Sequence, residues 1–361
     1  MTTNEQSEAS EQVREGTLSQ KKLLHEYASA PSTDRQAKKS LFHFSSEILR
    51  ALIIPVGAVV MLCGLFMYGS GALLNRANDL GRQCAGVALT GGESIRKYKF
   101  GMVTCSDGSS SIPQRSFEGL MELITPNKQS YVQRHGYDFI DASDLLDRRR
   151  PPSWSKILAV RKHLPQYDWI FWNDADSLVT NPSIALEDII SATVGSVDFE
   201  DMPDFIVTED VTGVNAGMFF LRNSKWSLDF LDLWWNQTSF IKPIGECKSG
   251  DNDALKYLMK IMPEKEKEKH IWIPYMQCVF NSNLWRPSWK SSHRLITLTK
   301  SVWQGSYSRG DFMVHLAGID NKRKWIERIL EDIDADGKSV RSAGRSILHN
   351  SVQAGGCRLG C

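Results

Sequence analysis

Apolar residues form one long segment near the start of the chain and several short runs farther on. The long segment, Ala51–Leu74, contains no charged residue and lies between Arg50 and Arg76, and about 20 apolar residues span the hydrocarbon core of a bilayer. A buried core helix is the alternative, but such helices are usually shorter and carry a polar face. A cleaved signal peptide is disfavoured because a long polar stretch precedes the segment. The pattern predicts one membrane-spanning helix over residues 51–74.

The flanks of this segment suggest its orientation. Four basic residues lie close before it and two lie in the comparable stretch after it: Arg35, Lys38, Lys39 and Arg50, then Arg76 and Arg82. The positive-inside rule therefore places the N-terminus in the cytosol and most of the chain on the other side. We expect a disordered polar tail over residues 1–50, a glycine-containing stem over 75–96, a folded domain over 97–335 and a poorly ordered tail over 336–361.

The folded part alternates two kinds of pattern. Short apolar runs predict buried strands at Phe100–Thr104, Tyr137–Ile140, Trp169–Trp172, Phe205–Thr208, Met218–Leu221, Ile271–Ile273 and Phe312–Leu316. Between them, Trp226–Trp234 and Ala254–Met262 repeat apolar residues at helical spacing. The alternation predicts an α/β sandwich with a mainly parallel sheet. We expect the charged run at 263–269 to be a solvated loop.

Composition narrows the function classes. The chain has 361 residues with 43 Lys and Arg against 42 Asp and Glu. This balance argues against a nucleic-acid partner held by bulk positive charge, and the 42% hydrophobic content supports a globular core. The seven cysteines form no Cys-x-x-Cys pair, so a structural zinc site is not expected.

The strongest chemical signal follows the predicted strand at Trp169–Trp172, where the chain runs into Asp174-Ala175-Asp176. Alternate residues of an extended chain point the same way, so both carboxylates reach one ion if the strand geometry persists. Such oxygens suit Mg²⁺ or Mn²⁺. A chance Asp-x-Asp in a turn or a helix cap is the alternative. The position is nevertheless the one where α/β sheets present ligands, beyond the carboxyl ends of strands.

Several motifs occur together in a fixed order over roughly residues 98–320. They are His135-Gly-Tyr-Asp138, Trp154-Ser-Lys156, the segment Asp168–Ser177, the segment Gly213–Trp234, Asp251–Leu258, and His315-Leu-Ala-Gly318. In order and spacing they resemble glycosyltransferase family 34, which contains fungal galactosyl- and mannosyltransferases and plant xylosyltransferases. The resemblance implies a Rossmann-like GT-A fold, a nucleotide-sugar donor, a divalent metal and retention of configuration at the anomeric carbon. It also implies a type II Golgi membrane protein.

The resemblance assigns metal and donor roles to individual residues. Asp174, Asp176 and His315 match the metal ligands, and a mixed carboxylate and imidazole set favours Mn²⁺ over Mg²⁺. The expected nucleotide-sugar-binding residues are Thr104, Ser106, Lys156, Asp174, Ala175, Asp176, Asn215, Gly217, Gly318 and Lys322. Three alternatives stay open: Thr104 and Ser106 as turn residues, Lys156 as a surface lysine, and Gly217 as a glycine that only turns the chain.

Asp251 and Asn252 match the pair that lies close to the reacting carbon, although an Asp that begins a helix is also a common N-cap. The family usually has Asp-Gln here, so Asn252 is a departure. A second departure follows Gly318, where many members have Gly-Cys and this chain has Gly-Ile-Asp-Asn-Lys322. Because no second catalytic carboxylate is evident, our hypothesis is front-face displacement, in which the leaving phosphate accepts the proton of the acceptor.

These observations predict a Golgi glycosyltransferase that moves a sugar from a UDP-sugar to a glycan, with galactose first, xylose second and mannose from a GDP donor third. One alternative is a catalytically silent relative that binds glycan or belongs to a complex with other glycosyltransferases; a weaker one is a metal-dependent phosphohydrolase. Homo- or hetero-oligomers are possible partners, and lipid contacts residues 51–74.

Three minor features carry less weight. Asn236-Gln-Thr238 is an N-glycosylation sequon, usable only on the lumenal side. Arg148–Arg150 favours a solvated loop over an acidic-acceptor site. Trp285, Trp289 and Trp303 are either core residues or stacking surfaces for acceptor sugars.

Overall fold

The computed structural model describes residues 51–70, 72–73, 98–108, 116–195, 197–246, 248–285, 293–294, 297 and 299–335. The tail expected over 1–50, the stem over 75–96 and the tail over 336–361 lie outside the described residues. The chain divides into two units, Met1–Phe66 and Met67–Cys361.

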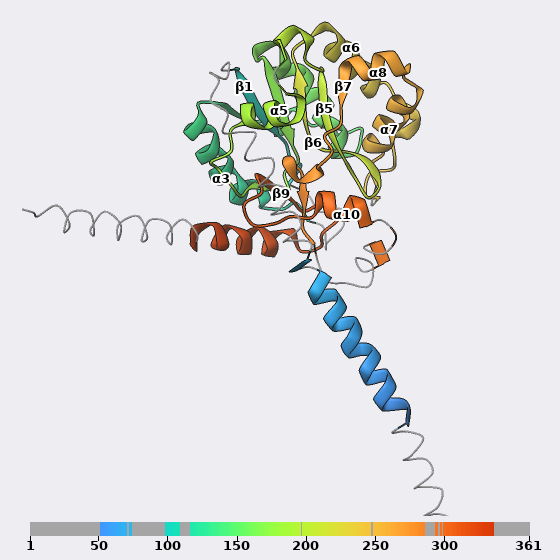
Figure 1. Ribbon diagram of the computed structural model, residues 1–361. Helices are drawn as coiled ribbons and strands as arrows, with labels where there is room; N and C mark the ends of the chain where they lie inside the picture. The colour runs from blue at the N-terminus through green and yellow to red at the C-terminus, as the bar shows by residue number, and fades with distance from the viewer. Residues whose placement is uncertain are drawn as a thin grey trace, which may run out of the picture. The chain divides into compact units, whose positions relative to one another are not determined.

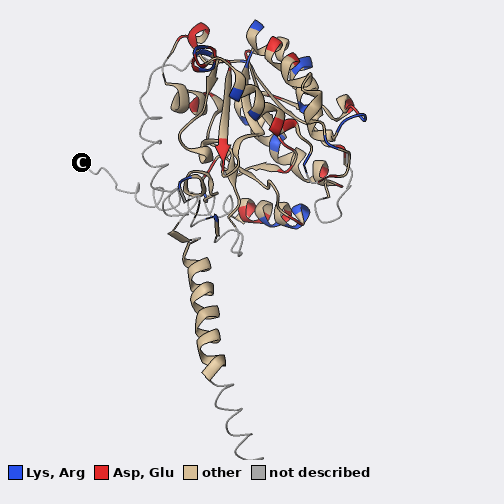
Figure 2. Ribbon diagram, turned by 90° about the vertical axis from the view of Figure 1, so that its right-hand side faces the viewer, with Lys and Arg blue, Asp and Glu red and all other residues tan. Residues whose placement is uncertain are grey.

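Ala51–Ser70 forms one continuous helix of 20 residues. It is long and apolar enough to cross a membrane, and Figure 2 shows that it carries no Lys, Arg, Asp or Glu. Large apolar side chains along it, such as Leu52, Ile54 and Val60, are exposed. A core helix of a soluble protein would bury them. The helix thus has the character expected for a membrane segment up to residue 70; residues 71 and 74 lie outside the description.

A mixed sheet of six strands organises the larger unit. Its order is β2 (Asp138–Asp141), β1 (Phe100–Thr104), β3 (Trp169–Asn173), β6 (Gly213–Arg222), β5 (Phe205–Asp210) and β7 (Ile271–Trp272). The β1–β2, β1–β3 and β5–β7 pairs are parallel, and β6 runs antiparallel to both of its neighbours. The predicted α/β class with a mainly parallel sheet is therefore confirmed, and the predicted strands in this region fall on observed ones.

A second, three-stranded sheet joins distant parts of the sequence. Its order is β4 (Ser177–Val179), β9 (Met313–His315) and β8 (Ser282–Asn283). Strand β9 is antiparallel to β4, with His315 opposite Ser177. The strand expected at Phe312–Leu316 is thereby confirmed as β9, whereas β4 and β8 were not predicted because they are very short. This pairing brings His315 beside the Asp174–Asp176 segment.

Helices cover both faces of the main sheet (Figure 1). The helices described are α3 (Leu120–His135), α4 (Ser155–His163), α5 (Leu186–Val194), α6 (Lys225–Trp235), α7 (Asp251–Ile261), α8 (Glu264–His270), α10 (Thr299–Gly305) and a helix over 322–335. The last of these packs with α3 and the second sheet. Short 3₁₀ turns are η2 (Ser143–Leu145), η3 (Pro152–Trp154), η4 (Leu164–Gln166), η5 (Phe199–Asp201), η6 (Thr238–Phe240) and η7 (Gln277–Val279).

The loop expected over 263–269 was wrong, because this run forms helix α8. Pro263 precedes the helix, Glu264 and Glu266 lie in its first turn, and Lys267 and Lys269 lie in its last. Acidic groups at the start and basic groups at the end complement the helix dipole. Because Lys265 and Glu268 alternate with these residues, this contribution is small, and the Lys267–Glu264 pair one turn apart (3.3 Å) adds to it.

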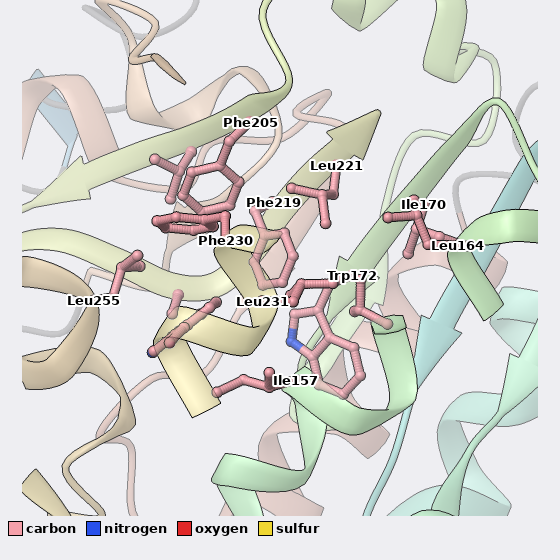
Figure 3. Packing of buried hydrophobic residues seen from close by; sticks show 14 of the residues in the cluster. Ile157, Leu164, Ile170, Trp172, Phe205, Phe219, Leu221, Phe230, Leu231 and Leu255 are labelled. Carbon is pink, nitrogen blue, oxygen red and sulfur yellow. The ribbon is translucent and has the colours of Figure 1, made fainter. Parts of the chain in front are cut away.

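Aromatic and aliphatic side chains fill both faces of the sheet. On one face, Phe205 packs against Phe219 and Phe230, with ring centroids 5.3 and 5.5 Å away, and Trp172 and Ile157 extend the cluster (Figure 3). Each fully buried side chain of this size contributes about 1.5–3 kcal/mol to folding. This packing holds the ends of β1, β3 and β6 rigidly, and those ends carry the polar residues of the candidate site.

Candidate active site

The Asp174-Ala175-Asp176 segment is a turn between β3 and β4. The extended geometry assumed for it does not persist beyond Asn173. Neighbouring strands fix the turn instead: the Asp174 N–H donates to the Gly217 carbonyl (2.8 Å), and the Leu316 N–H donates to the Asp176 carbonyl (2.9 Å). Ala175 is buried in a hydrophobic cluster with neighbours from β4 and β9. The turn directs both carboxylates to the same side.

Asp174, Asp176 and His315 meet at this turn. One ligand atom from each lies within 4.8 Å of the others. His315 Nε2 is 3.4 Å from Asp176 Oδ1 and 3.9 Å from Asp174 Oδ2. Two carboxylates and one imidazole form a donor set that suits a divalent cation such as Mn²⁺. The three predicted ligands are thus brought together by the fold, and the residues present fit the metal that the resemblance implies.

Gly217 makes room for the histidine ring. It lies within strand β6, and a Cβ on it would stand 2.2 Å from His315 Cε1 and 2.8 Å from the Asn215 side-chain oxygen. Asn215 is itself fixed, since its oxygen accepts from the Gly217 N–H and its amide donates to Asp210. Gly217 therefore serves close packing, and the alternative that it only turns the chain is wrong.

Lys156 connects the metal-binding turn to the predicted catalytic Asp251. Its Nζ, on helix α4, is 3.2 Å from Asp174 Oδ1 and 3.2 Å from Asp251 Oδ2, and it donates to the Ala216 carbonyl (3.0 Å). The side chain is 3% exposed, so the surface-lysine alternative is wrong. Burial alone favours the neutral amine, but the carboxylates of Asp174 and Asp251 hold the pKa of Lys156 above its usual value.

Asp251 is the first residue of α7, and the N-cap is Gly250 with φ 93°. The N-cap alternative for Asp251 is therefore wrong. Its Oδ1 accepts hydrogen bonds from the hydroxyls of Ser153 (2.9 Å) and Ser249 (2.5 Å). Burial favours its protonated form, but Lys156 and these hydroxyls hold the pKa of Asp251 below its usual value. Asp251 is therefore a buried, ionised carboxylate that accepts from Ser153 and Ser249 and pairs with Lys156.

The neighbouring Asn252 is bound to strand β6. Its Oδ1 accepts from the Ala216 N–H (2.8 Å) and its Nδ2 donates to the Val214 carbonyl (2.9 Å). Both ends of the amide therefore hold α7 against β6. Its predicted catalytic role stays a prediction.

Lys322 lies on the other side of the metal-binding turn. Its Nζ is 3.2 Å from Asp176 Oδ2 and donates to the carbonyls of Leu316 and Ile319. Gly318, with φ 67°, makes the left-handed turn between β9 and the helix that begins at Lys322. Burial opposes ionisation of Asp176, but Lys322 and His315 hold its pKa below the usual range.

A cavity of about 500 Å³ adjoins this lysine. Lys322, Arg323, Lys324 and Asn321 line it together with Ser116, Glu118 and Glu327. Three cations and two carboxylates therefore line this cavity, and Lys322 is the lining residue that also contacts Asp176.

Thr104 and Ser106 lie at the carboxyl end of β1, next to the end of β3 that carries Asp174. The Thr104 hydroxyl is buried and has no hydrogen-bond partner among the described residues. The Ser106 N–H donates to the Ser143 hydroxyl (3.0 Å), and the Ser106 hydroxyl accepts from Gly108 (3.2 Å). Cys105 between them has its pKa raised to about 12 by burial and by the nearby Asp174 charge. The expected roles of Thr104 and Ser106 in binding the nucleotide sugar remain predictions.

Two buried polar residues near the ligands escaped the sequence analysis. Lys128, in α3, is fully buried and its Nζ donates to the Asp174 carbonyl (3.3 Å); burial lowers its pKa to about 7. It shares the buried face of α3 with Ile124 and Tyr131. A lysine at helical spacing between apolar residues could therefore have indicated a buried cation. Asn281 contacts His315 and gave no signal of any kind.

The minor features of the sequence have different outcomes in the structure. Arg149 is solvent-exposed and paired with Asp147, as expected of a solvated loop. Arg150 instead donates to the Trp235 carbonyl (2.6 Å) and lies 3.6 Å over the Trp235 ring, which corrects the loop interpretation for that residue. Trp285 and Trp303 are partly buried, and their indole N–H groups have no partner within the part of the chain that the structure describes. Trp289 lies outside that part.

Comparison with known sequences gives a consistent match. The model of the galactosyl transferase GMA12/MNN10 family matches residues 97–325. A probable alpha-1,6-mannosyltransferase, MNN10, of Saccharomyces cerevisiae is 27% identical over 38% of this chain and 42% of its own. An alpha-1,2-galactosyltransferase of Schizosaccharomyces pombe is 23% identical over 58% of this chain and 59% of its own. The alignments thus span only part of these relatives.

Solved structures of low sequence identity also align. A glycosyltransferase involved in glycosylation of the major capsid of PBCV-1 is 13% identical, with a TM-score of 0.42, over 64% of this chain and 99% of its own. The galactosyltransferase LgtC, in complex with donor and acceptor sugar analogs, is 13% identical with a TM-score of 0.39, over 65% of this chain and 95% of its own.

Proposed function

Because this chain belongs to the galactosyl transferase GMA12/MNN10 family, we propose that it is a metal-dependent, retaining glycosyltransferase that moves a sugar from a nucleotide-sugar donor to a glycan. The family resemblance read from the motifs is confirmed by this membership, and the strand order confirms the α/β class of fold. We propose a UDP-sugar as the donor, with galactose first and xylose second, and GDP-mannose as the third candidate.

The convergence of Asp174, Asp176 and His315 carries the proposal. These residues would hold Mn²⁺ or Mg²⁺, which when bound neutralises charge on a departing diphosphate. Lys322 adds a cation at Asp176 and also lines a cavity with Arg323, Lys324 and two glutamates.

The environment of Asp251 supports front-face displacement. Retention by double displacement needs a carboxylate that is free to attack the anomeric carbon. The Asp251 carboxylate is instead held by Lys156 and two serine hydroxyls. We therefore propose that it orients the site electrostatically, and that a leaving phosphate oxygen accepts the acceptor's proton.

Donor turnover tests the activity. Full-length protein in detergent, with MnCl₂ and in turn UDP-galactose, UDP-xylose and GDP-mannose, is expected to release nucleoside diphosphate from one donor well above the others. Mass spectrometry of added oligosaccharides should show the matching mass increase. Background release from all donors would contradict the enzyme and favour a silent glycan-binding or scaffolding subunit, whereas release of sugar phosphate without an acceptor would favour a phosphohydrolase.

The silent-subunit alternative rests on two departures from the family pattern, Asn252 and the segment after Gly318. Lys322 nevertheless lies 3.2 Å from Asp176, so the altered segment keeps a cation at the metal-binding turn. Asn252 uses both ends of its amide on β6. The Lys322 contact favours the enzyme, whereas the Asn252 contacts show only how its amide is held. Oligomers with other glycosyltransferases remain part of the proposal.

We further propose a type II Golgi location with the larger unit in the lumen, and the sequon at Asn236 offers a test. Asn236 is exposed at the end of α6, and Thr238 begins the short η6 turn. In a eukaryotic secretory host, the wild-type band is expected to shift on peptide N-glycosidase treatment, while Asn236→Gln should not shift. If added protease digests the larger unit in intact microsomes and no glycan is found, the lumenal orientation is wrong.

A further inference from the structure

His315 has a second partner besides the two carboxylates. Its Nδ1 lies 2.9 Å from the side-chain oxygen of Asn281, on the ring edge opposite the Nε2 that faces Asp176. Asn281 is fully buried and His315 is 3% exposed. The contact is therefore shielded from water, where an unmade hydrogen bond is costly.

The side-chain amide of Asn281 has a second buried partner. Its Nδ2 donates to the hydroxyl of Thr208 (2.9 Å), which is also fully buried on strand β5. With the NH₂ group engaged there, the amide presents its oxygen to the imidazole. An amide oxygen only accepts hydrogen bonds, so His315 must carry its proton on Nδ1.

The backbone of Asn281 is equally well anchored. Its N–H donates to the Gln277 carbonyl (3.1 Å), and the Gln277 side chain donates to the Asn281 carbonyl (2.9 Å). Gln277 in turn is packed so closely on Gly305 that a Cβ there would lie 1.9 Å from its side-chain oxygen. Asn281 is thus a rigid support for the ring.

We propose that Asn281 is a positioning residue for the metal centre: through Thr208–Asn281–His315 it fixes the Nδ1–H tautomer and leaves the Nε2 lone pair directed at Asp174 and Asp176. A neutral imidazole binds a metal through its unprotonated nitrogen, and the group bonded to the other nitrogen decides which one that is. The inference rests on the proposed metal-dependent function, and it adds a partner outside the three ligands.

Metal affinity tests this directly, without reference to catalysis. Mn²⁺ is titrated into full-length protein in detergent, and free Mn²⁺ is followed by its electron paramagnetic resonance signal. Asn281→Leu, of similar volume but without an acceptor, is expected to weaken binding about 10- to 100-fold. Asn281→Asp keeps an acceptor at Nδ1 and should stay close to wild type. Thr208→Val frees the amide to rotate and should lie between the two.

Asn127→Leu is the matched control, because it removes an amide that bonds both backbone groups of Val179 and has no contact with His315 among the described residues. It should bind Mn²⁺ as wild type does. Wild-type affinity in Asn281→Leu, or equal losses in Asn281→Leu and Asn281→Asp, would overturn the proposal. If Asn281→Leu does not fold, wild-type affinity in Thr208→Val would do so. If wild type binds no Mn²⁺, the metal centre of the proposed function is itself wrong.

Discussion

Asp176→Asn is expected to abolish metal-dependent sugar transfer. Loss of partners that only orient metal ligands typically costs 10- to 100-fold, so loss of a ligand charge should exceed about 100-fold in turnover. The substitution also leaves the buried Lys322 amine without its carboxylate, 3.2 Å away in the wild type. Diphosphate release with the preferred donor, across a range of Mn²⁺ concentrations, measures the effect.

The matched control is Asp232→Asn. Asp232 is about half exposed and pairs with Arg161 on the surface, and such pairs contribute about 0–1 kcal/mol to stability. Turnover should equal that of wild type. If Asp176→Asn retained wild-type turnover at every metal concentration, the assignment of the metal ligands would have to be abandoned.

Lys156→Met is expected to have the largest effect on stability. It removes the cation between Asp174 and Asp251, each 3.2 Å from Nζ, and leaves the fully enclosed Asp251 carboxylate unpaired. Breaking a buried ion pair by removing one partner costs about 3–5 kcal/mol. The free energy of unfolding from denaturant titrations in EDTA gives this value without a contribution from bound metal.

Lys225→Met provides the comparison, since Lys225 is 88% exposed and pairs with Asp229 one helical turn away. It should cost no more than about 0.5 kcal/mol. A double variant, Lys156→Met with Asp251→Asn, is expected to recover part of the lost stability because the unpaired charge is gone. Equal stability of the Lys156 and Lys225 variants would show that the buried network does not hold the site together.

The elements that depend on burial were predictable from the sequence. Strand β1 matches its apolar run at Phe100–Thr104 because all five side chains are buried. Strands β4 and β8 were missed, since two or three residues are too few to show the alternation of apolar and polar residues that predicts a strand. Helix α8 was missed because a run of charged residues was interpreted as a solvated loop.

Some residues of the candidate site were likewise predictable from the sequence and others were not. Asp174, Asp176 and His315 were found through motif spacing, although the turn that brings them together was not foreseen. The environment of Lys156 was unpredictable, because α4, β3 and α7 contribute its partners from distant parts of the chain. The role of Asn281 was not predictable either, because it depends on one hydrogen bond between residues 34 positions apart. Contacts of this kind exist only once the chain has folded.

The hydrogen atom at the Cα of Gly217 occupies the place where any other residue would put its first side-chain carbon, 2.2 Å from the imidazole. Homologous chains can therefore be sorted at this one strand position before any assay. A chain that keeps both aspartates and the histidine but has alanine or serine here must tilt its ring out of the cluster or shift its strand. Loss of metal chemistry by steric exclusion, with every ligand intact, is a route to a non-catalytic paralogue that a motif search alone would overlook.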